Sequence, residues 1–80
     1  MDDKDVLGTI NQLAAREEEL RAAESDRRLS AEERNELAEI EVRLDQCWDL
    51  LRQRRARREF GQDPDQAETR PPDTVEHYRQ

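Results

Sequence analysis

The chain has 80 residues and a formal net charge of -7, with 32% hydrophobic and 44% charged residues. So short and polar a chain can bury only a thin core, which excludes a large domain built around an internal ligand cavity. Helix-forming residues such as Leu, Ala, Glu and Arg outnumber the β-branched and aromatic ones, and this composition predicts an all-α fold.

The first predicted helix covers residues 5 to 24. Its apolar side chains recur at helical spacing on one face, at Val6, Ile10, Leu13 and Leu20. The acidic residues at its start suit a helix N-terminus, where free backbone N–H groups favour negative charge. The periodicity breaks over residues 25 to 30, so we expect the chain to turn there.

The second predicted helix covers residues 31 to 60 and has the stronger signals. Ser30 and Glu33 have the spacing of a capping box, in which each side chain accepts a hydrogen bond from the other residue's backbone N–H. Its apolar stripe alternates steps of three and four residues, at Leu37, Ile40, Leu44, Cys47 and Leu51. Trp48 widens this stripe on one flank, and Gly61 ends the helix.

A short connection between two amphipathic helices predicts an antiparallel hairpin, because each helix covers the apolar stripe of the other. Pairing Leu20 with Leu37 also sets Val6 opposite Leu51, so the two stripes match along their length. One unbroken helix in a coiled coil is the rival geometry, and the break at residues 25 to 30 argues against it. Since a two-helix core is thin, we expect the hairpin to self-associate into a homo-oligomeric helical bundle.

The chain divides into a helical hairpin over residues 1 to 60 and a tail over residues 61 to 80. The tail is polar, contains all three prolines and has no apolar periodicity, so we expect it to be extended or disordered unless it docks on a surface. Val75 and Tyr78 are the residues best suited to anchor it, and Tyr78 is a candidate contact with a partner.

No group of residues marks a catalytic, cofactor or metal site. Cys47 is the only cysteine and lies at an inward helical position, where a thiol normally acts as a small hydrophobic group. His77 is the only histidine and lies in the predicted tail, so the sequence supplies neither a zinc ligand set nor a nucleophile–base pair. We therefore expect a non-enzymatic protein.

The sequence also lacks the apolar stretch that a membrane span requires and the basic, apolar start of a secretory signal. A single cysteine suits a reducing compartment. We therefore expect a cytoplasmic protein that does not bind membrane.

Two features point to binding. Trp48 is the only tryptophan, and a two-helix core rarely covers so large a side chain, which favours a contact with a protein partner there. The second feature is the arginine cluster at residues 52 to 58, which holds five arginines and no acid in an otherwise acidic chain. This cluster predicts either a contact with an acidic protein or binding of nucleic acid or the ribosome.

The hairpin register carries the acidic N-terminus onto the arginine cluster. It sets three pairs near one another: Asp5 with Arg52, Asp3 with Arg54, and Asp2 with Arg55. Part of the cluster is then an internal clamp, and Arg57 and Arg58 are the candidates for touching a partner. We favour a helical module that self-associates and binds a protein of unknown identity; the alternative is a nucleic-acid or ribosome binder acting through the arginine cluster.

A resemblance to a known family rests on residues 44 to 58, which read Leu-Asp-Gln-Cys-Trp-Asp-Leu-Leu-Arg-Gln-Arg-Arg-Ala-Arg-Arg. This stretch resembles the signature of a family of small actinobacterial proteins catalogued as domain of unknown function 2630. The turn at residues 61 to 64 and four tail residues are also similar to that family, namely Arg70, Val75, Glu76 and Tyr78. The resemblance implies a bacterial cytoplasmic protein whose tail matters, and it carries no activity, cofactor or partner.

Overall fold

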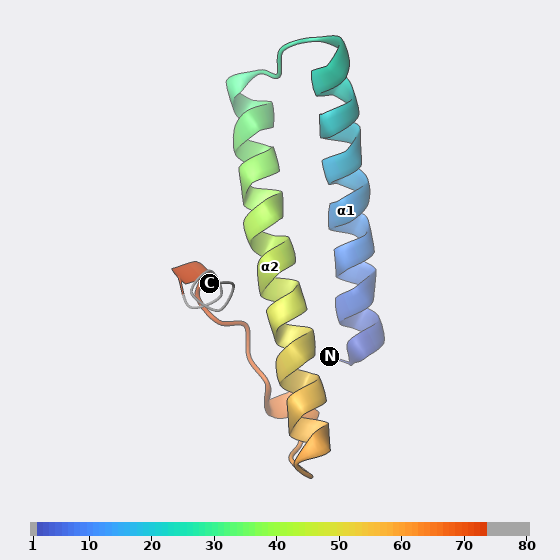
Figure 1. Cartoon of the computed structure of the whole chain (residues 1–80), viewed down its shortest axis with the longest axis vertical. Helices are drawn as coiled ribbons and strands as arrows, with labels where there is room; N and C mark the ends of the chain where they lie inside the picture. Colours follow the sequence, from blue (N-terminus) through green and yellow to red (C-terminus); the bar gives the residue numbers. More distant parts are fainter. Residues whose placement is uncertain (1, 74–80) are drawn as a thin grey trace.

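The structure is a computed structural model that describes residues 2–73, and two antiparallel helices make up most of it (Figure 1). The first helix, α1, covers Asp3–Asp26, and the second, α2, covers Ala31–Glu59. A short 3-10 helix, η1, follows at Pro64–Gln66. The described part of the chain contains no strand, and the predicted all-α hairpin is confirmed.

A capping box at the N-terminus of α1 makes this helix longer than the apolar pattern predicted. The Asp2 carboxylate accepts a hydrogen bond from the Asp5 N–H at 2.9 Å, and the Asp5 carboxylate accepts one from the Asp2 N–H at 3.1 Å. These bonds satisfy N–H groups at the chain's entry into the helix. The apolar pattern starts only at Val6 and therefore could not show that Asp3 already belongs to α1.

Local sequence signals mark both ends of α2, namely the capping box at Ser30 and the glycine at position 61. Ser30 and Glu33 form the predicted capping box, with hydrogen bonds of 3.0 and 2.9 Å. At the other end Gly61 adopts a φ of 71°, in the left-handed region that favours glycine. This conformation lets the Gln62 N–H donate to the Arg57 carbonyl at 2.7 Å, which is the Schellman bond that closes a helix.

The core lies between α1 and α2 in two clusters that share Leu44 and Cys47. The cluster near the open end of the hairpin contains Val6, Ile10, Leu50 and Leu51, with Ala67 of the tail packed against it. The cluster near the loop contains Leu13, Leu20 and Ile40, with Leu37 packed against it. The predicted stripe is thus in the core, and Leu50, which the sequence analysis left out of the stripe, is buried with it.

Ion pairs between the helices lie beside the apolar stripe. Arg16 binds Glu36 with its Nη2 at 2.8 Å, and Arg21 binds Glu41 at 2.6 Å. These side chains are about half exposed, so each pair contributes at most about 1 kcal/mol. Each pair also favours the observed alignment of the two helices, because a shift of α1 along α2 would separate its two charges.

Candidate functional site

The chain turns back after α2 and runs along this helix in the opposite direction (Figure 1). Gln53 donates to the Glu68 carbonyl at 2.7 Å, and Gln46, two turns earlier in α2, donates to the Arg70 carbonyl at 3.2 Å. We call residues 64–70 the docked segment. The tail therefore docks on the hairpin as far as the structure describes it, whereas the expected anchors in residues 74–80, including Tyr78, lie outside the described residues.

A buried ion pair holds the docked segment to α2. Asp49 is 0% exposed, and the Arg70 guanidinium grips both of its carboxylate oxygens, with Nε at 2.8 Å from Oδ2. Gln53 donates to the same Oδ2 at 2.9 Å. The hydrogen bonds from Arg70 lower the pKa of Asp49, against the opposing effect of burial. The carboxylate is therefore charged at neutral pH and compensated within the fold.

Sequence reasoning missed the Asp49–Arg70 pair. Its one visible signal is an acid inside the most apolar stretch of α2, between Cys47 and Leu51. A charge in such a place requires a partner, because an unpaired buried carboxylate is very costly. The partner lies 21 residues further along the chain, where no helical spacing could indicate it.

A second buried charge joins three parts of the chain. Arg54 is 5% exposed, and it binds Asp3 of α1 at 2.6 Å and Asp65 of η1 at 3.0 Å. It also donates to the Pro64 carbonyl at 3.2 Å. Arg58 binds the same Asp3. The hydrogen bond from Arg58, together with a smaller effect of the one from Arg54, lowers the pKa of Asp3 to about 2. The predicted contact between Asp3 and Arg54 is confirmed.

The remaining pairs of the expected clamp differ from the prediction. The carboxylates of Asp2 and Asp5 bind backbone N–H groups in the α1 cap, and Arg52 lies 4.0 Å from Asp49. Among residues 2–73, the side chains of Arg55 and Arg57 have no carboxylate partner. Of the two arginines expected to touch a partner, Arg58 is therefore bound within the fold, while Arg57 is half-buried and unpaired within the described residues.

The described part of the tail partly covers one side of the hairpin, which we call the covered side, and leaves the opposite side open. A residue one position before a stripe residue lies on one flank of its helix, and in antiparallel helices these flanks fall on the same side. Thr9 and Gln46 occupy such positions, and both line a hollow together with Thr69 of the tail. Ala67 and Thr69 thus cover part of this side, and the chain then continues along the face of α2 that points away from α1, where Arg70 binds Asp49 (Figure 1).

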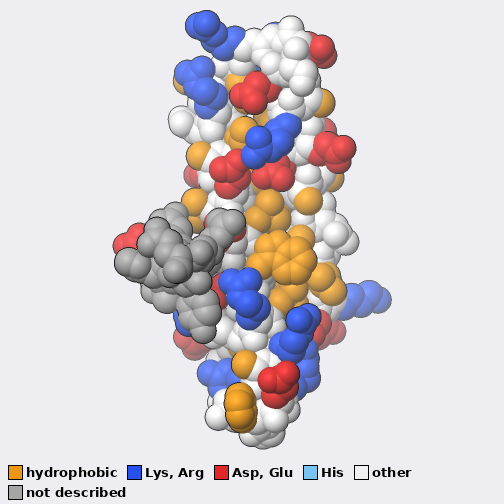
Figure 2. Space-filling model, viewed as in Figure 1, with side chains coloured by type: hydrophobic (Ala, Val, Ile, Leu, Met, Phe, Trp, Pro, Cys, Tyr) orange, Lys and Arg blue, Asp and Glu red, His pale blue; other side chains and the backbone are white. Residues whose placement is uncertain are grey.

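The open side carries the exposed apolar residues. Leu7 and Trp48 each follow a stripe residue by one position, which puts them together on the side opposite to Thr69. Trp48 is 46% exposed and Leu7 is 42% exposed. Figure 2 shows hydrophobic side chains gathered between the two helices on one broad face of the molecule. We call the surface formed by Leu7 and Trp48 the Trp48 face.

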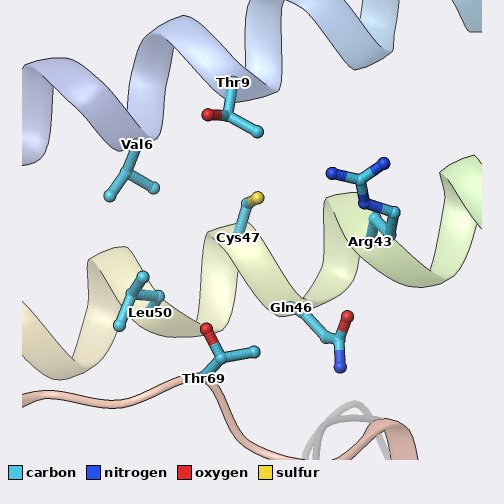
Figure 3. A pocket seen from close by; sticks show the side chains of 7 residues that line it. All are labelled: Val6, Thr9, Arg43, Gln46, Cys47, Leu50 and Thr69. Carbon is cyan, nitrogen blue, oxygen red and sulfur yellow. The ribbon is translucent and has the colours of Figure 1, made fainter. Parts of the chain in front are cut away.

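The hollow on the covered side is small (Figure 3). Its volume is about 160 Å³, below the roughly 300 to 1,000 Å³ of typical ligand pockets. Burial raises the pKa of the Cys47 thiol in its wall, which keeps the thiol protonated and a weak nucleophile. No group of three potential metal ligands occurs in the part of the chain that the structure describes.

Comparisons with known proteins find relatives along nearly the whole chain. Residues 2–80 match the family described as "Protein of unknown function (DUF2630)". Uncharacterized proteins from Mycobacterium bovis and from two strains of Mycobacterium tuberculosis are 51% identical over 77 residues, which is 95% of this chain and 88% of each relative. No solved structure matches. Within residues 2–73, no helix has the length and apolar character needed to cross a membrane.

Proposed function

The chain belongs to the family described as "Protein of unknown function (DUF2630)", and on this premise we propose that it is a non-enzymatic helical module for protein–protein interaction. It acts in the bacterial cytoplasm and contacts protein through the Trp48 face. The observation that carries this proposal is that Trp48 and Leu7 stay exposed together on one side of the hairpin, while the docked segment packs against α2 elsewhere.

Exposed aromatic and aliphatic side chains in a cluster support a protein contact. Trp is the residue type most enriched at the energetic centres of interfaces, since it buries a large apolar area with little conformational entropy to lose. Glu41 and Arg21 form an ion pair beside this face. An apolar centre with charged residues around it is the usual arrangement of an interface.

The arginine cluster gives weaker support to nucleic-acid binding. Arg54 and Arg58 are held by Asp3 and Asp65, so their charges are neutralised within the fold. A phosphate backbone would have to compete with these carboxylates and with the net charge of -7. The cluster is better suited to fixing the N-terminus and the tail on α2.

A pull-down from the native host tests the proposal. The bait is the full chain, and a Trp48→Glu variant is compared with the wild type after circular dichroism has shown that both are helical. We expect specific protein partners, further copies of the chain included, to be lost from the variant. Nuclease treatment should leave the wild-type result unchanged, since the contact is with protein.

Phe60→Glu is the matched control. Phe60 is also an aromatic residue and is 78% exposed, but it lies at the C-terminal end of α2, away from the Trp48 face. Its replacement should leave the captured proteins unchanged. Equal capture by the wild type and the Trp48 variant would contradict the proposal, and capture that depends on nucleic acid would favour the alternative.

A further inference from the structure

We infer that the Trp48 face binds a second copy of this chain in a symmetric dimer, with the two α2 helices antiparallel and crossing at Trp48. This inference rests on the proposed function and names its partner. In such a dimer a two-fold axis lies between the two faces and perpendicular to the helices. Each α2 then faces the α2 of the partner subunit, and each α1 faces α1.

The first argument is the pattern of charges along α2. Glu41 lies seven residues before Trp48, and Arg55 lies seven residues after it. Seven residues are close to two helical turns, so the three side chains form one line on the helix surface. The line therefore carries an acid at one end, the tryptophan in the middle and a base at the other end, with about 10 Å between successive members.

This line is complementary to itself when one copy is reversed. A two-fold axis at Trp48 places the two tryptophans together and sets Glu41 opposite Arg55 of the partner subunit, twice in each dimer. A parallel arrangement would instead set like charges opposite each other. The charges beside Trp48 thus favour a second copy of the chain as the partner, and they favour the antiparallel orientation of its α2 helix.

The charges needed for this contact are accessible. Arg55 is exposed and has no carboxylate partner among residues 2–73, although it stands between the paired Arg54 and Arg58. Glu41 is half exposed and binds Arg21 across the hairpin. In the dimer the Glu41 carboxylate would bridge Arg21 and Arg55 of the partner subunit.

The second argument is the amount of surface. The chain exposes 5972 Å² and measures 50 × 25 × 17 Å. A compact monomer of 9.5 kDa exposes about 5,000 Å², and the elongated shape of this chain adds roughly 900 Å². One side of a standard protein interface buries about 800 Å², so the chain has enough surface for such a contact. The Trp48 face is the side on which this area would be buried, because Leu7 and Trp48 are two exposed large apolar residues that lie there together.

A charge-swap experiment on the purified full chain tests the inference. The wild type should sediment as a dimer. Arg55→Glu places Glu opposite Glu, and Glu41→Arg places Arg opposite Arg, so each variant alone should dissociate at least about tenfold more readily. Mixing the two variants restores two opposite-charge pairs in the heterodimer, and the mixture should sediment as a dimer again.

Arg57→Glu is the control, because it makes the same change in charge on the same helix away from the line through Trp48. It should dimerise like the wild type. A monomeric wild type, single variants that dimerise normally, or a mixture that stays monomeric would each overturn the inference. A monomeric wild type that still captures another host protein through Trp48 would overturn only the dimer and leave the proposed function standing.

Discussion

Replacing Arg70 by Ala removes the guanidinium that holds the docked segment to α2. In the intact fold this guanidinium donates hydrogen bonds to both carboxylate oxygens of Asp49, which is 0% exposed. Removing one partner of a buried ion pair typically costs about 3 to 5 kcal/mol, because the other charge is left out of water without compensation. The variant therefore tests whether the tail contributes to the stability of the hairpin.

Two features of the site put the expected loss at the lower end of this range. The Arg70 side chain is 33% exposed, so water already reaches one edge of the pair. Gln53 keeps its hydrogen bond of 2.9 Å to Asp49 when Arg70 is gone. We expect the free energy of unfolding to fall by about 3 kcal/mol. For a domain of this size the melting temperature should then fall by roughly 12 °C or more.

Urea and thermal unfolding followed by far-UV circular dichroism measure this loss. Arg28→Ala is the control, since Arg28 is exposed in the loop and its side chain has no carboxylate partner among the described residues. Its effect should stay within about 0.5 kcal/mol.

A double variant shows whether the loss of stability comes from leaving the Asp49 charge unpaired or from releasing the docked segment. Asp49→Leu combined with Arg70→Met replaces both charges by apolar groups, and such replacements of buried pairs are often neutral. We expect the double variant to recover most of the stability that Arg70→Ala loses. An Arg70→Ala chain within about 0.5 kcal/mol of the wild type would refute the reasoning, because the pair would then not stabilise the fold.

Three further changes in stability follow from the structure. Ser30→Ala removes the α2 cap and should cost about 1 kcal/mol in urea unfolding, with an unchanged value refuting the cap. Leu44→Ala should cost about 2 kcal/mol, at the low end for a core leucine, because Leu44 is only half-buried between the two core clusters. The pKa values of Asp3 and Glu33 are lowered to about 2 from 3.8 and 4.5, and that of Asp49 is lowered as well. Since these carboxylates stabilise the fold while charged, the melting temperature should fall between about pH 5 and pH 2, and a flat profile would contradict their roles.

The hairpin was predictable because its signals are local. The spacing of Ile40 and its stripe neighbours fixes the buried face of α2, and Ser30 with Glu33 marks where α2 begins. The register followed from the matching of two apolar stripes, and it also predicted the contact between Asp3 and Arg54. The capping box depends on residues that are close in sequence. The register depends on two apolar stripes that bury each other fully in only one alignment.

The covered side of the hairpin was not predictable in the same way. The docked segment has no repeating apolar pattern, and it is held by the ion pairs of Arg70 with Asp49 and of Asp65 with Arg54, by Ala67 in the core, and by bonds to backbone carbonyls. Backbone carbonyls are the same in every sequence, so they give no sequence signal. The path of the tail along α2 therefore emerged only from the structure, whereas the exposure of Trp48 had a signal in the sequence.

Photocrosslinking in living cells tests the central claim most directly. A light-activated amino acid replaces Trp48 in the full chain, expressed in the native host, and Phe60 is replaced in a parallel strain as the exposed control. The proposed function predicts discrete protein adducts from position 48 that the control position does not give, and the inferred dimer predicts an adduct with the mass of two chains. Adducts with nucleic acid alone, or no adduct beyond those of the control, would contradict the account.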